Sequence, residues 1–310
     1  MIVVFGSINI DMVIQVHALP RPGETVLSDA YNLYPGGKGA NTAVAAARAG
    51  ATTLLFGQVG PYGFADRALV MLREAGVGLD GVAVSERPTG AATIWVDSGG
   101  ENSIVVASGA NLDARASQVP DSALGPDTLV SLQMEVPAKE NWAIIERAKA
   151  VGARVLLNMA PAGMVPETVL RSVDYLVANE IEAATLAGEL GLDTDQPTRV
   201  PRLLAQRYGL TCIVTLGGAG ALAFGPDGGY SIPALPIAPV DTTAAGDAFC
   251  GGLAAALDNG MGLYDALCRA SAGAGLACRI AGSQSSLPDQ DAIEASLANL
   301  PEGRRLGERA

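Results

Sequence analysis

The sequence predicts an α/β fold built on a parallel sheet flanked by helices. Two observations carry this prediction. From about residue 125 onward, strand-like runs alternate with helix-like ones, as in repeated strand–helix–strand units. Near the start, Met1 to Gly6 form a short apolar run that ends in glycine, which is typical of a buried parallel strand. The strand-like runs of the second half are 128–134, 154–158, 174–178 and 211–216.

Composition narrows the class of protein. The chain has 310 residues, of which 49% are hydrophobic and 17% charged, enough for one large α/β domain or a core with a smaller attachment. Its net charge of −12, with no basic run, argues against a nucleic-acid partner.

No segment approaches the roughly 18 continuous apolar residues of a membrane span, and no basic residue precedes the first apolar run, so we expect neither a membrane partner nor a signal peptide. Four cysteines without a C-x-x-C pair favour reduced thiols in a cytoplasmic protein.

Histidine chemistry is all but excluded, because His17 is the single histidine in the chain. A Ser-His-Asp triad or a multi-histidine metal site would need His17 to act alone from within a strand-like stretch. We therefore expect the chemistry to come from carboxylates, backbone donors and a cofactor.

The first third of the chain continues with polar and β-rich segments. Asn9 and Asp11 follow the first strand, where they fit a ligand site and ordinary turn formation equally well. Residues 12–34 read as exposed hairpin strands, and two β-rich runs within 91–108 are joined by a hairpin signal at 97–102. Segments 12–34 and 91–108 together are consistent with a separate small sheet. Between them, 53–59 reads as a further strand and 64–75 as a helix.

Pro35 to Gly50 is a glycine-rich segment that runs into an alanine-rich helix. The spacing is wrong for a Walker A loop, no Ser or Thr directly follows Lys38, and G-x-G-x-x-G is absent. The small helix residues predict close packing against another element, and Gly36 and Gly37 allow a ligand to approach the backbone.

Polar groups follow several of the other predicted strands. Each group alone is more often a helix cap or a loop, but together they place carboxylates, amides and glycines at one edge of one sheet. The segments are Gln133–Glu135, Asn179–Glu182, Thr215–Gly220 and Asp241–Thr243.

The stretch from Pro239 to Phe249 is central to the prediction of function. Ala244, Ala245 and Gly246 form a turn of small residues before a helix-like run, so a ligand can reach the backbone N–H groups. The unpaired donors and the dipole at a helix start suit a phosphate, and Asp247 would lie beside it, able to take a proton from an attacking hydroxyl. The alternative is an ordinary helix start in which the dipole favours Asp247.

With these segments in order, the chain resembles the ribokinase (PfkB) family of carbohydrate kinases, which also holds fructokinases and adenosine kinases. The two signature segments are Gly36–Asn41 and Asp241–Asp247, about 200 residues apart, and the likeness spans roughly 2–298, closest to the ribokinases. The resemblance implies a three-layer α/β/α kinase domain over 1–300. It also implies a small β-sheet lid inserted at 12–34 and 91–108. After the domain we expect a charged C-terminal tail over 301–310, frayed from Glu302 onward.

The resemblance also implies an activity and a set of roles. The activity is ATP-dependent transfer of the γ-phosphate to a primary hydroxyl of a pentose, foremost D-ribose at O5. The alternatives are another sugar such as fructose, a nucleoside, or a catalytically silent sugar-binding relative. Asp247 would be the base, with the amides of Ala244, Ala245, Gly246 and Asp247 as the anion hole. The lid would pair two subunits, giving a homodimer.

The implied binding residues fall into three sets. Those for the sugar are Asn9, Asp11, Gly37, Lys38, Asn41, Glu135 and Asp247. Those for ATP are Asn179, Thr215, Gly217, Gly218, Gly220, Gly246 and Ser271, with Glu182 holding Mg²⁺ through water. A monovalent cation, K⁺, is implied at Asp241, Thr243, Ile280, Gly282 and Ser286, although loop 280–286 lacks the Lys and Pro that ribokinases often carry there.

Overall fold

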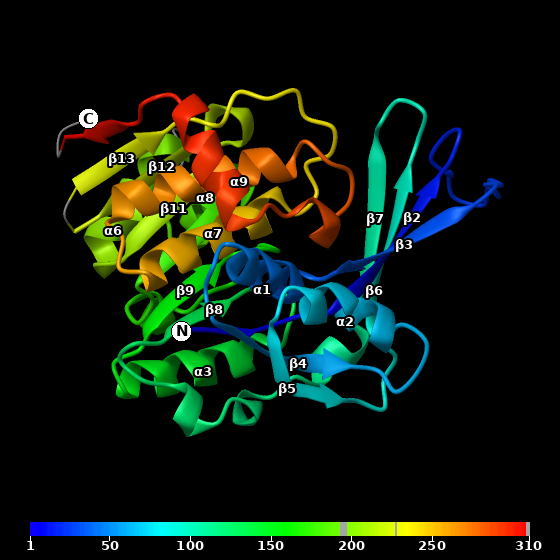
Figure 1. Ribbon diagram of the computed structural model, residues 1–310, viewed down its shortest axis with the longest axis horizontal. Helices are drawn as coiled ribbons and strands as arrows, with labels where there is room; N and C mark the ends of the chain where they lie inside the picture. Colours follow the sequence, from blue (N-terminus) through cyan, green and yellow to red (C-terminus); the bar gives the residue numbers. More distant parts are fainter. Residues whose placement is uncertain (193–196, 227, 308–310) are drawn as a thin grey trace.

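The protein consists of two sheets, a large one in the body and a small one that projects from it (Figure 1). The structure is a computed structural model and describes residues 1–192, 197–226 and 228–307. The strands of the large sheet are β1 (Ile2–Phe5), β4 (Thr53–Val59), β5 (Gly78–Val84), β8 (Leu129–Leu132), β9 (Arg154–Asn158), β10 (Tyr175–Asn179), β11 (Thr211–Thr215), β12 (Ala221–Gly225), β13 (Gly228–Ile232) and β14 (Arg304–Leu306). The helices are α1 (Lys38–Arg48), α2 (Ala65–Glu74), α3 (Ala138–Ala150), α4 (Glu167–Leu170), α5 (Glu180–Glu189), α6 (Val200–Tyr208), α7 (Ala245–Asp258), α8 (Leu263–Ala277) and α9 (Gln290–Ser296).

The large sheet is mainly parallel, as predicted. Its order is β14-β13-β12-β11-β10-β9-β8-β1-β4-β5. The strands from β11 to β5 pair in parallel, whereas β12, β13 and β14 add an antiparallel edge. The carboxyl ends of the parallel strands therefore meet at one edge of the sheet, where ligands bind in open α/β folds.

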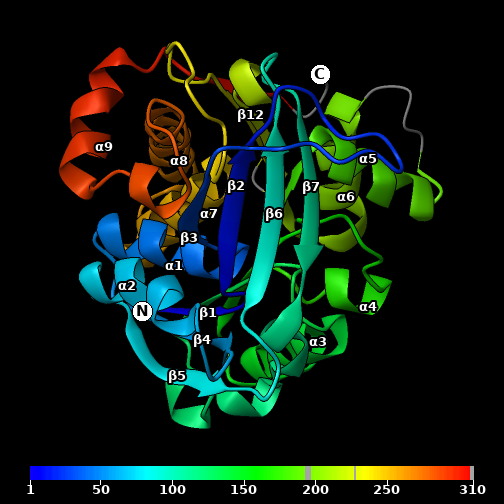
Figure 2. The same cartoon turned by 90° about the vertical axis from the view of Figure 1, so that its right-hand side faces the viewer.

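Helices cover both faces of this sheet, which gives the predicted three layers. In β1, Ile2 and Val4 enter one apolar core while Val3 and Phe5 enter the other, because successive strand residues point to opposite faces. The helices α1, α2, α7, α8 and α9 lie on one side and α3 to α6 on the other (Figure 2).

Helix α1 packs closely against α7, as its small residues predicted. Gly251 of α7 makes this approach possible, because a Cβ there would lie 2.5 Å from the Cβ of Ala45. The contact holds the first turns of the two helices next to each other, although α1 and α7 lie about 200 residues apart in the sequence.

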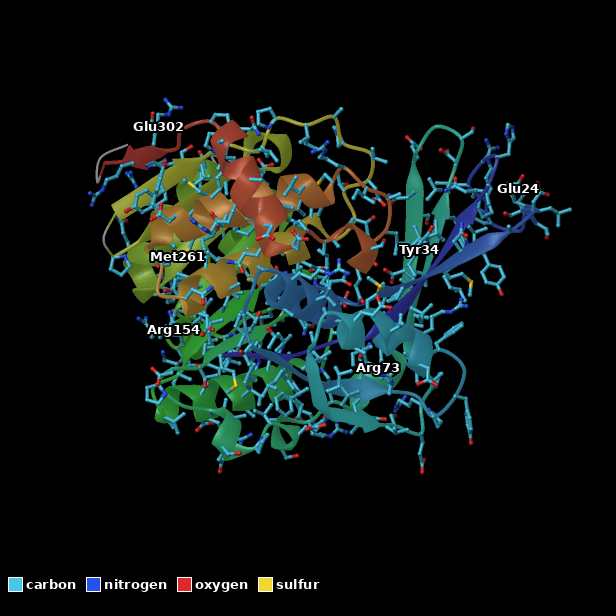
Figure 3. The ribbon with its side chains drawn as sticks, viewed as in Figure 1. Glu24, Tyr34, Arg73, Arg154, Met261 and Glu302 are labelled. Atoms are coloured by element: carbon cyan, nitrogen blue, oxygen red, sulfur yellow. The ribbon has the colours of Figure 1, made fainter. Side chains whose placement is uncertain are left out.

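The small sheet is formed by β2 (Asn9–Gln15), β3 (Tyr31–Gly36), β6 (Gly90–Val96) and β7 (Asn102–Ala107), in the order β3-β2-β6-β7. It stands away from the three layers (Figures 1 and 2), and we call it the lid sheet. Figure 3 places Glu24 at its outer end and Tyr34 close to the body. The predicted separate sheet is therefore present.

Three features differ from the sequence predictions. Asn9 and Asp11 lie inside β2 of the lid sheet rather than in a turn after β1. The prediction of a frayed tail is wrong for residues 304–306, because these residues form β14 and pair with β13. A short strand can complete an open antiparallel edge in this way. Residues 308–310 of that tail lie outside the described part of the chain, and β5, β12 and β13 were not predicted. Across the described residues, no helix is both long and apolar enough to cross a membrane.

Candidate active site

Three adjoining cavities follow the carboxyl edge of the large sheet. We call them the lid cavity, of about 530 Å³, and the middle and outer cavities, each of about 450 Å³. Lys38, Ala244 and Asp247 line both the lid and the middle cavity, and Thr215, Gly217, Thr242 and Gly246 line both the middle and the outer one. The turn before α7 is therefore the junction of all three.

Most of the predicted site residues line these cavities. In the lid cavity they are Asn9, Asp11, Gly37, Lys38, Asn41, Glu135, Thr243, Ala244 and Asp247. In the middle cavity they are Lys38, Asn179, Glu182, Thr215, Gly217, Ala244, Gly246 and Asp247. In the outer cavity they are Thr215, Gly217, Gly218, Gly220, Ala245, Gly246 and Ser271. Asp241, Ile280, Gly282 and Ser286 line none of the three.

The start of α7 leaves backbone donors free. Ala244 precedes the helix with a φ of 59°, and no side chain caps the first turn. Within the described residues, the N–H groups of Gly246 and Asp247 have no acceptor. No side chain caps them, and the nearby Thr242 O accepts from Ala245 N instead. A Cβ at Gly246 would meet nothing within 4 Å. This helix start therefore offers open space and free donors to an anion.

Asp247 is buried, with 5% of its surface exposed, and accepts a hydrogen bond of 2.9 Å at Oδ2 from Asn41 Nδ2. Burial raises the pKa of Asp247 to about 6; Lys38 and Asn41 oppose this rise, and the charges of Glu135 and Glu182 add to it. A carboxylate of this kind is a stronger base than an exposed one and is still largely ionised at neutral pH. Asn41 Oδ1 has no partner among the described residues.

In contrast to α7, the start of α1 is filled by protein groups. Lys38 N donates to Glu135 Oε2 at 3.1 Å, Gly39 N to Ser7 Oγ at 3.1 Å, and Ala40 N to Ser7 O at 2.9 Å. Gly37, which precedes the helix at a φ of 90°, has no room for a side chain, since a Cβ would lie 2.7 Å from Asn9 N. The backbone of this motif is thus fixed by Ser7, Asn9 and Glu135, while the side chains of Lys38 and Asn41 line the lid cavity.

Acidic groups gather around Lys38. Burial raises the pKa of Asp11 to about 7, and the charges of Glu135 and Asp247 raise it further while Lys38 lowers it. Burial lowers the pKa of Lys38, but the nearby carboxylates, Asp247 foremost and then Glu135, outweigh this effect and raise it above its ordinary value. The lid cavity therefore holds a charged lysine among carboxylates that can accept hydrogen bonds.

Sequence reasoning missed several residues of the lid cavity. Asn111 lies in a short 3-10 helix, η1 (Gly109–Asp113), and its Nδ2 donates to Asn9 Oδ1 at 2.7 Å. Because Asn111 follows the β-rich run that ends near Ser108, the rule of polar groups after strands would have found it. The lid sheet adds an apolar wall that no motif marks, made of Ala92, Ile94, Ile104 and Val106.

In the middle cavity, Asn179 and Glu182 close the start of α5 on itself. Glu182 N donates to Asn179 Oδ1 and Asn179 N donates to Glu182 Oε2, both at 2.8 Å, which is a reciprocal capping box. The predicted pair is therefore in place, and Glu182 Oε1 is left for other partners.

The outer cavity is mainly apolar. Leu235, Ile237 and Phe249 line it, and Ser271 Oγ donates to Pro233 O at 2.7 Å. Gly220, at a φ of 95°, is also required by the fold, because a Cβ there would lie 2.0 Å from Ile232 O. This combination suits a flat, largely apolar ring system.

Asp241 joins two loops beside the α7 turn. Its Oδ1 accepts from Thr243 N at 2.8 Å and its Oδ2 from Gly282 N at 2.9 Å. Burial raises the pKa of Asp241, but these hydrogen bonds outweigh it and hold the pKa below its usual value. Ser286 is buried and donates to Ser283 O, and Ile280 is exposed. In the described part of the chain, no three His, Cys, Asp or Glu side chains form a group that could hold a metal ion.

Comparison with known proteins identifies the family of this chain. The chain matches the pfkB family of carbohydrate kinases over residues 1–290. It is 37% identical to the bifunctional ribokinase/ribose-5-phosphate isomerase A of Fructilactobacillus sanfranciscensis over 94% of this chain, which spans 55% of that protein. It is 32% identical to the ribokinase of Lactococcus lactis subsp. lactis, covering 96% of this chain and 97% of that protein.

Solved structures of ribokinases have the same fold as this chain. The ribokinase of Thermotoga maritima has a TM-score of 0.89 at 31% identity, covering 96% of this chain and 99% of that one. The ribokinase of Arabidopsis thaliana, complexed with ribose and ATP, has a TM-score of 0.84 at 30% identity, covering 96% and 98%. On these matches and this geometry, the chain belongs to the pfkB family of carbohydrate kinases.

Proposed function

We propose that the protein transfers the γ-phosphate of ATP to the primary hydroxyl of a pentose, giving ribose 5-phosphate from D-ribose. One observation carries this proposal: Asp247 lies where the lid and middle cavities meet, beside the free N–H groups at the start of α7. An acceptor hydroxyl on one side and a phosphoryl group on the other would both reach it. The names of the relatives, and the ribose and ATP bound by the Arabidopsis ribokinase, support ribose as the acceptor.

The reaction follows from these groups. Asp247 takes the proton of the sugar hydroxyl, whose oxygen forms a bond to the γ-phosphorus as the bond to the β–γ bridging oxygen of ATP breaks, leaving ADP. The amides of Ala244, Ala245, Gly246 and Asp247 form the proposed anion hole, with the free donors of Gly246 and Asp247 central to it. The pKa of about 6 keeps Asp247 largely ionised and ready to accept a proton at neutral pH.

The lid cavity is the proposed sugar site. Asn9, Asp11, Gly37, Lys38, Asn41 and Glu135 line it, and carboxylates suit vicinal hydroxyls because one carboxylate accepts two hydrogen bonds. The apolar wall from the lid sheet would cover the sugar and exclude water, which would otherwise accept the phosphate.

The middle and outer cavities are the proposed ATP site. The phosphates would lie by Asn179, Thr215, Gly217 and Gly246, and the base in the apolar outer cavity by Gly218, Gly220 and Ser271. Glu182 fits a Mg²⁺ ion held mainly by phosphates and water, since Mg²⁺ in such sites needs only one or two carboxylates. When bound, Mg²⁺ would neutralise charge on the phosphates.

The loops joined by Asp241 are the proposed cation site. An ionised carboxylate with backbone and hydroxyl oxygens from Thr243, Ile280, Gly282 and Ser286 is a donor set that suits K⁺. A bound K⁺ would fix the loop that leads into the anion hole.

The remaining assignments complete the proposal. The kinase domain spans 1–300, with the lid at 12–34 and 91–108, and β14 at 304–306 joins its sheet instead of lying in a separate tail. The protein is a cytoplasmic homodimer that pairs through the lid, which is supported by the exposed apolar side chain of Val105 on β7, since successive strand residues point to opposite faces and Ile104 and Val106 line the lid cavity.

An ADP-release assay on pentoses, hexoses and nucleosides, with and without K⁺, tests the proposal. We expect turnover on D-ribose, increased by K⁺. Preference for another sugar or a nucleoside would overturn ribose and keep the kinase mechanism. Absence of turnover on every acceptor would favour a silent sugar-binding protein.

A further inference from the structure

We infer that Asn111 is a positioning residue that turns the amide of Asn9 so that its N–H₂ group faces the lid cavity. Asn9 then acts on the ligand as a hydrogen-bond donor. The identity of the ligand as a sugar rests on the proposed function, but the orientation of Asn9 does not.

Asn111 lies at the base of the lid sheet. It is in η1, which leads from β7 back into the body, and only 1% of its surface is exposed. Its side chain bridges two other parts of the chain: Ile8 N donates to Asn111 Oδ1 at 2.9 Å, and Asn111 Nδ2 donates to Asn9 Oδ1 at 2.7 Å. Ile8 and Asn9 are the residues at which the chain passes from β1 into the lid sheet.

The direction of these hydrogen bonds is dictated by the backbone. The N–H group of Ile8 can only donate, so the atom of Asn111 that it contacts must be the carbonyl oxygen. The other end of the Asn111 amide is then a donor, and it requires an acceptor in Asn9. Asn9 Oδ1 fills that role, which leaves Asn9 Nδ2 directed away from Asn111.

The packing around this pair leaves little room for rearrangement. Gly90, at the start of β6, lies against both amides, and a Cβ there would be 2.1 Å from Asn9 Oδ1 and 2.4 Å from Asn111 Nδ2. Both asparagines are buried. A glycine at position 90 is thus required for the two side chains to stay in hydrogen-bond contact.

The consequence is a defined polarity along β2. No acceptor for Asn9 Nδ2 occurs among the described residues, and Asn9 lines the lid cavity. Asp11 lies two residues further along the same strand and therefore on the same side. The strand presents a donor and then a carboxylate acceptor, so the ligand needs an oxygen that accepts a hydrogen bond from Asn9 and a hydroxyl that donates one to Asp11.

Asn111→Asp tests the inference directly, at pH 8.5, where the new carboxyl is ionised. It keeps an oxygen for Ile8 N but replaces the donor with an acceptor, so Asn9 must turn its N–H₂ group toward residue 111. We expect NMR of protein labelled with ¹⁵N in asparagine side chains to show rapid exchange of the Asn9 amide with water in the wild type and slow exchange in the variant. An Asn9 amide that exchanges slowly in the wild type, or equally in both proteins, would overturn the inference.

Kinetics supply a second readout on ribose and its monodeoxy analogues. We expect Asn111→Asp to raise KM for ribose about tenfold with KM for ATP unchanged, because one neutral hydrogen bond is lost. The wild type should discriminate against the analogue that lacks the oxygen facing Asn9, and the variant should not. Asn111→Leu, which removes the donor without adding charge, should also abolish that discrimination.

Controls distinguish this inference from unspecific effects of mutation and from the proposed function. Thr128→Val removes a buried hydrogen bond to Ala123 O near the start of β8 and should leave both kinetics and the Asn9 signal unchanged. Retained discrimination in both Asn111 variants would overturn the inference while ribose turnover stood. If the wild type turned over no sugar, the proposed function would fail, and the exchange measurement would still decide the orientation of Asn9.

Discussion

Two helices begin at the middle cavity, and their first turns differ. Helix α5 closes its start with its own side chains, through the reciprocal hydrogen bonds of Asn179 and Glu182. Helix α7 has no side-chain cap, begins after a left-handed Ala244, and leaves the donors of Gly246 and Asp247 free within the described residues. A capped start contributes to stability, whereas an open one keeps its donors for a ligand.

Helix α1 gives a third case. Its first-turn donors are taken up by Ser7 and Glu135, so they fix the backbone beside the proposed sugar site and are not free for an anion. Of the three helix starts around Asp247, the one at α7 is therefore the proposed site of the transferred phosphoryl group.

The largest effect is expected for Asp247→Asn, which removes the base at the open helix start. We expect kcat to fall about 10³-fold or more while the affinities for sugar and ATP, measured by calorimetry, remain close to those of the wild type. Asp291→Asn, the same change at an exposed acid in the first turn of α9, is the control and should leave kcat unchanged. Full activity of Asp247→Asn would disprove the assignment of the base.

A smaller effect is expected at the donors. Gly246→Pro removes one free N–H group in the first turn, where proline is tolerated, and should lower kcat about 10²-fold. Gly246→Ala keeps that N–H group and adds a methyl group in open space, so it should lower kcat much less. Equal losses in the two variants would show that the position is sensitive to bulk and not to the donor.

The pH dependence of kcat/KM for the sugar tests the environment of Asp247. Activity should decline on the acid side between about pH 7 and 6, as Asp11 and Asp247 take up protons; the two interact, so the profile belongs to the pair. Asn41→Leu removes a hydrogen bond that stabilises the carboxylate, so the pKa of Asp247 should rise and the acid limb should move about one unit toward higher pH. If the acid limb of the profile stayed at the same pH in Asn41→Leu, the pKa of Asp247 would not determine the loss of activity at low pH.

The smallest effect concerns stability and the capped helix. Asn179→Ala should lower the free energy of unfolding by about 1 kcal/mol in urea titrations, because it removes the cap of α5. Gly246→Ala should leave it unchanged or raise it slightly, because α7 has no cap to lose and alanine is the better helix former. Equal destabilisation of the two variants would remove the contrast between the helix starts.

The sequence predicted the fold well where local patterns are strong. Apolar runs identified most of the parallel strands, and the small residues of α1 anticipated its close contact with α7. The antiparallel edge β12-β13-β14 escaped prediction because strands at an edge are short and depend on pairing, as the three residues of β14 show.

The site was predicted to a similar extent. Motif residues such as Asp247 and Asn41 lie together at the cavities. The position of Asn111 after a strand could have been noticed, but its contacts with Ile8 and Asn9, about 100 residues away in the sequence, appear only in the folded structure. For α7, the sequence predicted donors within reach of a ligand but left an ordinary helix start open, and the structure favours the first reading. Whether a helix start is capped depends on side-chain positions, and Asn179 and Asp241 look alike as candidate caps in the sequence.

A crystal structure with ADP, ribose and a fluoroaluminate that mimics the transferred phosphoryl group would test the central claim most directly. We predict a fluoroaluminate within about 3 Å of the amide nitrogens of Gly246 and Asp247, with ribose O5 at a similar distance from the Asp247 carboxylate. A fluoroaluminate bound instead at the start of α5 or α1, or a ribose whose O5 points away from Asp247, would contradict it.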